Sequence, residues 1–197
     1  EALNYYYQLK ALKARNLIQP NSRSIPSFAQ IQACAIQSDD LRRAYNQLGG
    51  SCCGFRHNAV DDAQGDNEFD FNLPMWQYDY QQLTPEFRLA TIDYDETKVL
   101  MNNSWSRCHF EKPGRLDALI LWVEYGSATS SDTISTFDRF HRQQVRILKE
   151  SIVVAKDEAT ATISTISDDP GVLYIQCKID FYSSEDDYSL EIKVKKA

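Results

Sequence analysis

Leu116-Asp117-Ala118-Leu119-Ile120-Leu121-Trp122-Val123-Glu124-Tyr125 is the most apolar of the strand-like segments in this chain. Leu119, Leu121 and Val123 alternate with Ala118, Ile120 and Trp122, so a strand formed here has apolar side chains on both faces. Strands with two apolar faces lie in the interior of a sheet, where other elements cover both sides. We therefore expect this segment to be the central strand of the fold.

Strand-like segments continue along most of the remaining chain, with turn sequences between them. The last of them alternates apolar and polar residues, which is typical of an antiparallel strand with one face in water. The predicted strands span residues 25–38, 87–94, 104–112, 116–125, 141–149, 159–167, 172–182 and 188–195. Residues 98–103 and 126–139 are predicted to be longer loops. Helices do not alternate with the strands, which excludes a doubly wound nucleotide-binding sheet and favours an antiparallel barrel.

Helical patterns are confined to the first quarter of the chain. Residues 2–18 place Tyr5, Leu9 and Leu12 on one stripe, and Pro20 forbids continuation, so we expect one amphipathic helix that ends near Asn16.

A second, short helix begins at Asp39-Asp40 and ends before Gly49-Gly50. Residues 42–73 as a whole are predicted to form an irregular arm inserted into a β-barrel domain of residues 19–197, because their second part is rich in Gly, Asn and Asp and has no periodicity.

The composition of the 197 residues is that of an ordinary globular domain, with 43% apolar residues. A net charge of −7 argues against nucleic acid as a direct partner, since phosphate binding needs a basic excess, and it suits basic protein partners. No apolar run approaches ~18 residues, so no membrane-spanning helix is predicted. The chain does not begin with Met, so the sequence leaves a signal peptide undecided.

The cysteines are odd in number and scattered, which favours reduced thiols and a cytoplasmic or nuclear location. Cys52, Cys53 and His57 are the candidate metal ligands, for a zinc ion completed by residues of a longer parent chain. Ordinary thiols in an irregular arm are the interpretation that we favour, because adjacent cysteines do not readily turn both sulfurs to one ion. Cys108 and His109 are neighbours in a strand and point to opposite faces, so they form no catalytic pair.

His141 is the candidate catalytic residue, at the entry to the predicted strand 141–149. It is either a loop histidine bonded to the backbone or a site residue whose tautomer a carboxylate fixes. The chain contains no glycine-rich phosphate loop and no zinc-protease or serine-hydrolase motif, so no cofactor site is expected within it.

Several segments in order resemble the C-terminal β-barrel half of protein arginine methyltransferases, most of all the second module of the tandem, type-seven member. His141-Arg142-Gln143-Gln144-Val145 is similar to the family's Thr-His-Trp loop and the strand after it. The other matching segments are Asn16 to Ser27, Ala29 to Leu41, Cys53-Gly54-Phe55, Met75-Trp76-Gln77-Tyr78, Leu89 to Tyr94, and Leu119 to Tyr125.

The resemblance implies a barrel that packs on a separate domain, which binds S-adenosylmethionine and is linked through the helix of residues 1–18. It also implies an arm that contacts a second methyltransferase module or subunit, and arginine-containing protein substrates such as histones. Glu1 falls where the second glutamate of the family's double-glutamate loop grips the substrate guanidinium.

Two departures from the family pattern affect the expected activity. Arg142 replaces the tryptophan of the Thr-His-Trp loop, and Phe140 stands in place of the threonine. A cation at this place repels a guanidinium, so we expect a structural or pseudo-catalytic module, inactive by itself without the cofactor domain. The alternatives are a non-catalytic assembly barrel and a ligand-binding jelly roll with Trp76, Trp105 and Trp122 around a cleft; we expect these tryptophans in the core instead.

Overall fold

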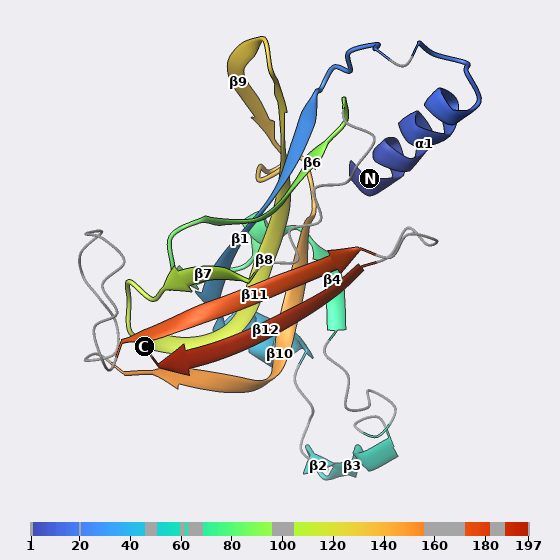
Figure 1. The fold of residues 1–197 in the computed structure, drawn as a ribbon. Helices are drawn as coiled ribbons and strands as arrows, with labels where there is room; N and C mark the ends of the chain where they lie inside the picture. The colour runs from blue at the N-terminus through green and yellow to red at the C-terminus, as the bar shows by residue number, and fades with distance from the viewer. Residues whose placement is uncertain are drawn as a thin grey trace.

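The computed structural model describes residues 2–19, 21–45, 51–59, 62, 69–95, 105–155, 172–181 and 188–196. In this part of the chain the fold is mainly β, with an N-terminal helix and antiparallel sheets, as the sequence predicted (Figure 1).

The larger sheet has seven strands among the described residues, and every pairing in it is antiparallel. The strands follow the order β4-β10-β8-β1-β5, while β6 also pairs with β1 and β9 with β8. Their bounds are β1 Phe28–Gln37, β4 Phe69–Leu73, β5 Gln81–Gln82, β6 Phe87–Asp93, β8 Gly114–Ser127, β9 Ser130–Ser135 and β10 Gln143–Val154.

The smaller sheet contains β7 (Ser106–His109), β11 (Leu173–Phe181) and β12 (Tyr188–Lys196) in the order β12-β11-β7. It crosses in front of the larger sheet in Figure 1, and the apolar faces of the two sheets share one core. Leu190 and Ile175 from this sheet meet Leu119 and Leu121 of β8 in that core. A hydrogen bond also joins the two sheets, because the guanidinium of Arg146 in β10 donates to the carbonyl of Leu190 in β12 at 3.1 Å. The two sheets therefore close into a barrel-like body.

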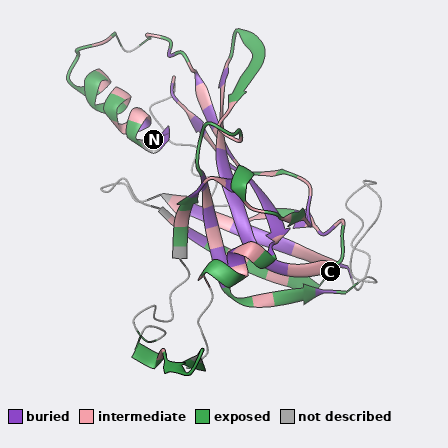
Figure 2. Cartoon of the chain, turned by 180° about the vertical axis from the view of Figure 1, so that it is seen from behind, coloured by how far each residue is buried: buried purple, intermediate pink, exposed green. Residues whose placement is uncertain are grey.

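Strand β8 is the central strand, as its two apolar faces predicted. It pairs with β1 on one edge and with β10 and β9 on the other. Leu119 and Leu121 point into the core between the sheets, whereas Ile120 and Trp122 enter a second core, covered by Leu41, Met75 and their neighbours. Figure 2 shows the buried residues concentrated along these crossing strands.

A buried carboxylate fixes the start of β8. Asp117 is 1% exposed, and it accepts hydrogen bonds from the Ser38 amide at 2.9 Å, from the Arg115 Nε at 2.7 Å and from the Ser151 hydroxyl at 2.7 Å. Its bonds with Arg115, together with those of Asp39, raise the pKa of that guanidinium above its ordinary value. Because these donors satisfy the buried charge, β8, β10 and the chain after β1 are held in one arrangement.

Helix α1 (Ala2–Ala14) ends two residues before the predicted Asn16, which has a left-handed φ of 55°. Ala2 and Tyr6 are buried, and Leu9 of the predicted apolar stripe packs against the core. Leu12, on the same stripe, is 37% exposed, because it lies beyond this contact with the core. Tyr94 at the end of β6 secures that half, since its hydroxyl donates to the carbonyl of Ala2 at 3.1 Å.

The predicted loop 126–139 is wrong in part. β8 continues to Ser127 and turns back into β9, so a hairpin occupies most of this segment. β9 is exposed along nearly its whole length, and its Ser-Ser-Asp-Thr-Ile-Ser sequence has none of the apolar alternation that marks a half-buried strand. The predicted strand 159–167 lies outside the described residues.

The predicted arm, residues 42–73, is partly regular. Its last five residues form β4 and pair with β10 in the larger sheet. Its first residues belong to helix α2 (Asp39–Tyr45). Farther along the arm, β2 (Ser51–Cys52) and β3 (Phe55–Arg56) form a hairpin. Cys53 and Gly54 turn this hairpin with φ angles of 53° and 83°, as in a tight two-residue turn. Figure 1 shows the hairpin standing apart from both sheets.

Replacing Trp122 by alanine tests the central position of β8. The side chain is 3% exposed and stacks on Phe137 at 4.7 Å between ring centroids, so its loss leaves a cavity. We expect the free energy of unfolding to fall by about 3–5 kcal/mol, measured by chemical denaturation. Ile134→Ala is the control, since that side chain is 72% exposed and its loss should cost under ~0.5 kcal/mol. Equal effects of the two substitutions would contradict the strand assignment.

Candidate functional site

The loop between β9 and β10 is organised around Asp138. Its Oδ1 accepts hydrogen bonds from the backbone amides of Phe140 at 2.7 Å and His141 at 2.9 Å. The same oxygen lies 2.9 Å from the His141 Nδ1. These contacts, that of the His141 side chain foremost, lower the pKa of the Asp138 carboxyl below its ordinary value. The carboxylate contact that we considered for His141 is therefore present, although the imidazole is 55% exposed.

Gln143, the first residue of β10, fixes this loop through hydrogen bonds of its side chain. Its side chain is buried, and its amide nitrogen donates to the carbonyls of Thr136 at 2.8 Å, Asp138 at 3.2 Å and His141 at 2.8 Å. Its amide oxygen accepts a 3.2 Å bond from the backbone of Met75. One buried amide thus joins the β9–β10 loop to the segment that follows β4.

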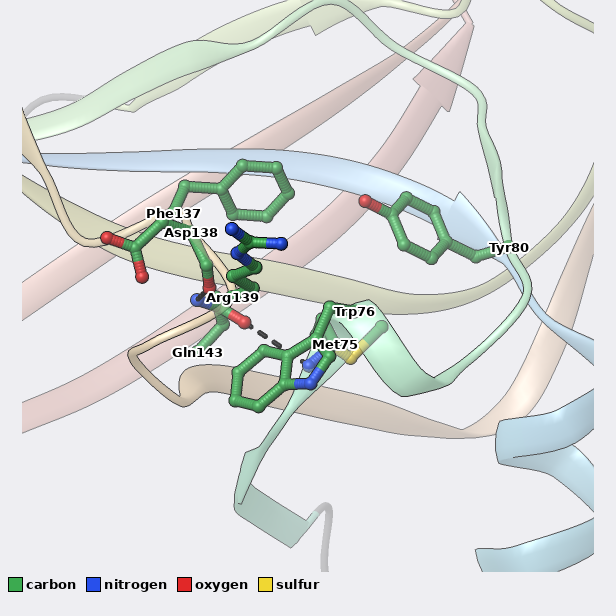
Figure 3. Close-up of a pocket in the computed structure, with 7 residues that line it drawn as sticks. All are labelled: Met75, Trp76, Tyr80, Phe137, Asp138, Arg139 and Gln143. Atoms are coloured by element: carbon green, nitrogen blue, oxygen red, sulfur yellow. Dashed lines mark hydrogen bonds between the residues drawn. The ribbon is translucent and has the colours of Figure 1, made fainter.

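A small pocket opens between these two segments. It has a volume of about 200 Å³ and is lined by Met75, Trp76, Tyr80, Phe137, Asp138, Arg139 and Gln143. In Figure 3 the ring of Phe137 and the hydroxyl end of Tyr80 lie toward the guanidinium of Arg139, the indole of Trp76 lies beyond the amide of Gln143, and the Asp138 carboxylate points away from these groups. The pocket has aromatic walls and a cation at its mouth, which suits recognition of a ligand.

The buried thiols offer no activated nucleophile. Burial raises the pKa of Cys34, Cys108 and Cys177 to about 12 each, so these thiols stay protonated near neutral pH. These three are free cysteines. Cys108 is buried. The adjacent His109 pairs with Tyr174 of β11, and its ring packs edge-on against the Tyr174 ring at 6.0 Å between centroids.

Only some of the predicted site residues lie within the described part of the chain. Glu1 lies outside the described residues, and so does the side chain of Cys52. Cys53 is exposed in the hairpin turn and His57 follows β3, on the arm and not in the pocket. Within the part of the chain that the structure describes, no group of three or more His, Cys, Asp and Glu side chains is placed to hold a metal ion.

The three tryptophans do not converge on a cleft. Trp122 is in the core as expected, but Trp76 is 46% exposed and lines the pocket. Trp105 is half-buried beside the smaller sheet, where the ammonium of Lys193 lies 4.3 Å from its ring centroid. The expectation that these tryptophans belong to the core is therefore confirmed for Trp122 and wrong for Trp76 and Trp105, which are in neither apolar cluster.

Sequence reasoning missed the pocket as a site. Its two halves are separated by more than fifty residues, and only the pairing of β4 with β10 brings them together. Asp138, three residues before His141, was the available signal, since an aspartate at this spacing readily caps a turn.

An N-terminal helix followed by an antiparallel β-barrel with an inserted hairpin defines the class of the chain as a β-barrel module. Neither protein-family models nor curated protein sequences give a match. In the described part of the chain, no helix has the length and apolarity needed to cross a membrane.

Among solved structures, the chain is similar to PRMT1 from Trypanosoma brucei in its enzyme–prozyme heterotetrameric complex with AdoHcy. The TM-score is 0.66 at 12% identity, over 98% of this chain and 58% of that one. PRMT6 and PRMT6-SAH give TM-scores of 0.49 and 0.48, at 13% and 15% identity, over 94% and 87% of this chain and 59% and 55% of theirs. The fold is therefore like that of a protein arginine methyltransferase barrel module, and the chain spans less than two thirds of these neighbours.

Replacing Gln143 by alanine tests whether it holds the loop. The change leaves the Met75 amide and three loop carbonyls without their partner, which should lower the free energy of unfolding by about 1–3 kcal/mol. His141→Ala is the matched control on the same loop, because its exposed side chain should contribute under ~0.5 kcal/mol. Thermal or chemical denaturation compares them. A Gln143→Ala protein as stable as the His141→Ala protein would show that the loop does not depend on Gln143.

Proposed function

We propose that this chain is the β-barrel module of an S-adenosylmethionine-dependent protein arginine methyltransferase, which transfers methyl groups to arginine side chains of proteins. The observation that supports it most is the similarity of fold to the PRMT1 structure over 98% of this chain. The motif order described above supports the same family, and within it the second module of the type-seven, tandem member. In this proposal, the remainder of the parent protein supplies the domain that binds S-adenosylmethionine.

The role that we propose for this module is structural or pseudo-catalytic. Arg142 stands where the family has a tryptophan, and it is exposed on the same loop as Arg139. Two cations beside the entrance of an arginine-binding pocket would repel a substrate guanidinium. If the module is active, Glu1 and His141 are its candidate catalytic residues. Cys52, Cys53 and His57 are the candidate zinc ligands.

The proposed partner is a second methyltransferase module or subunit, contacted through the arm. Phe55, the first residue of β3 after the hairpin turn, is 71% exposed, and a large apolar side chain on a projecting element suits a protein interface. The PRMT1 structure was determined as a heterotetrameric enzyme–prozyme complex, which is the kind of assembly we propose. A cytoplasmic or nuclear location is part of this proposal, and the free cysteines fit it.

Methyl transfer by the full-length parent protein tests the proposal. The assay measures transfer from S-adenosylmethionine to an arginine-rich peptide, for the parent and for the parent with His141→Ala. We expect transfer by both at rates within about twofold, because the loop does not form the working pocket. Melting temperature and S-adenosylmethionine affinity, measured on both proteins, are the controls.

Two results would contradict the proposal in different ways. A loss of at least about tenfold in rate, with stability and cofactor affinity unchanged, would show that this module forms a catalytic site. A parent protein that neither binds S-adenosylmethionine nor transfers methyl groups would remove the methyltransferase assignment itself.

A further inference from the structure

The pocket beside the β9–β10 loop contains a cation without a polar partner. Arg139 is exposed and lines the pocket, and among the described residues no acceptor forms a hydrogen bond or ion pair with its guanidinium. The guanidinium lies 5.3 Å from the centroid of the Phe140 ring. By contrast, Arg115 and Arg146 each bind a carboxylate. The guanidinium of Arg139 is therefore available to a ligand.

The nearest acidic side chain is engaged elsewhere. The Asp138 carboxylate binds the imidazole and amide of His141 and the amide of Phe140, and it points away from the pocket (Figure 3). Arg142, three residues after Arg139, adds a second exposed cation to the same loop. The charge at the pocket mouth consequently attracts an anion and repels a guanidinium.

The walls of the pocket favour an apolar group beside that anion. Phe137 and Tyr80 are half-buried, Met75 is buried, and Trp76 presents a 46% exposed indole. A carboxylate bound in two-pronged fashion by Arg139 would place the adjoining side chain against these rings. The volume of about 200 Å³ is below the ~300–1,000 Å³ of typical small-molecule sites, so the pocket fits one or two side chains.

We propose that this pocket binds an acidic peptide segment of a partner protein, in which an aspartate or glutamate adjoins an apolar side chain. The carboxylate pairs with Arg139, and the apolar side chain lies against Trp76 and Phe137. The inference stands on the geometry of the pocket and does not depend on the methyltransferase assignment.

Fluorescence polarisation with matched peptides tests the proposal on the intact parent protein. The probe is a fluorescein-labelled, C-terminally amidated peptide of alternating phenylalanine and glutamate, and every comparison peptide carries the same label, so that the peptides differ in charge only through their side chains. The comparison peptides replace every glutamate by glutamine or by arginine. We expect the glutamate peptide to bind about tenfold more tightly than the glutamine peptide, since charge-assisted bonds are lost in the latter.

Two arginine variants locate the effect. Arg139→Gln should remove the preference for the glutamate peptide, whereas Arg142→Gln, which changes the loop's charge equally but lies outside the pocket lining, should keep at least half of the affinity. Trp76→Ala should weaken the glutamate and glutamine peptides alike. All three positions are exposed, so melting temperatures should stay within about 2 °C.

Three results would overturn the proposal. One is equal or absent binding of the glutamate and glutamine peptides, and another is tighter binding of the arginine peptide. The third is a result in which the arginine variants do not locate the effect at Arg139. Either the Arg139→Gln protein keeps its preference for the glutamate peptide, or both arginine variants lose the same affinity, which would indicate attraction by net charge alone.

Discussion

The burial of strand β8 on both of its faces is the constraint on which the rest of the structure depends. Leu119 and Leu121 lie on one face of β8, and Ile120 and Trp122 lie on the other. Each face must be buried by apolar residues from outside the sheet that contains β8. The smaller sheet covers the first face, and α2 with the segment after β4 covers the second. Because that second cover includes Met75 and Phe137, the pocket forms at the edge of the Trp122 core.

Polar groups that the cores cannot leave unpaired complete the arrangement. Asp117 lies at the start of β8 with its charge satisfied by Arg115, Ser38 and Ser151. At the other end of the same region, the Gln143 amide joins the β9–β10 loop to Met75. A buried group of this kind contributes little net energy but costs several kcal/mol when its partners are removed, so it selects one packing among the apolar alternatives. The loop that presents Arg139 and His141 is positioned in this way.

Apolar periodicity predicted the parts of the fold that bury one or two faces. The double alternation of residues 116–125 identified the central strand, and the single alternation of residues 188–195 matches β12. The sequence did not predict β9, because both faces of this strand are exposed. It did not predict β4 either, because the five residues of this strand follow an irregular arm. The pocket could not be predicted, since tertiary pairing alone brings Trp76 and Tyr80 to Phe137 and Arg139.

The site also shows where motif resemblance reaches its limit. His141 lies in the loop that the resemblance indicated, and its ring contacts the Asp138 carboxylate, yet the pocket is lined by its neighbour Arg139 and by the aromatic residues Trp76, Tyr80 and Phe137. The proposed preference for an anion rests on the cations Arg139 and Arg142, because the Asp138 carboxylate between them and β9 is bound by His141 and Phe140. In this account the fold is set by β8, whereas the ligand preference is set by a few exposed side chains.

Native-state amide hydrogen exchange tests the central position of β8 most directly. The account predicts that the amides of residues 118–121 exchange slowest and only through global unfolding, because β1 and β10 pair with both edges of the strand there and both of its faces are covered. The amides of α1 and of the β2–β3 hairpin should exchange much faster. Exchange of residues 118–121 at rates like those of the hairpin would contradict the account.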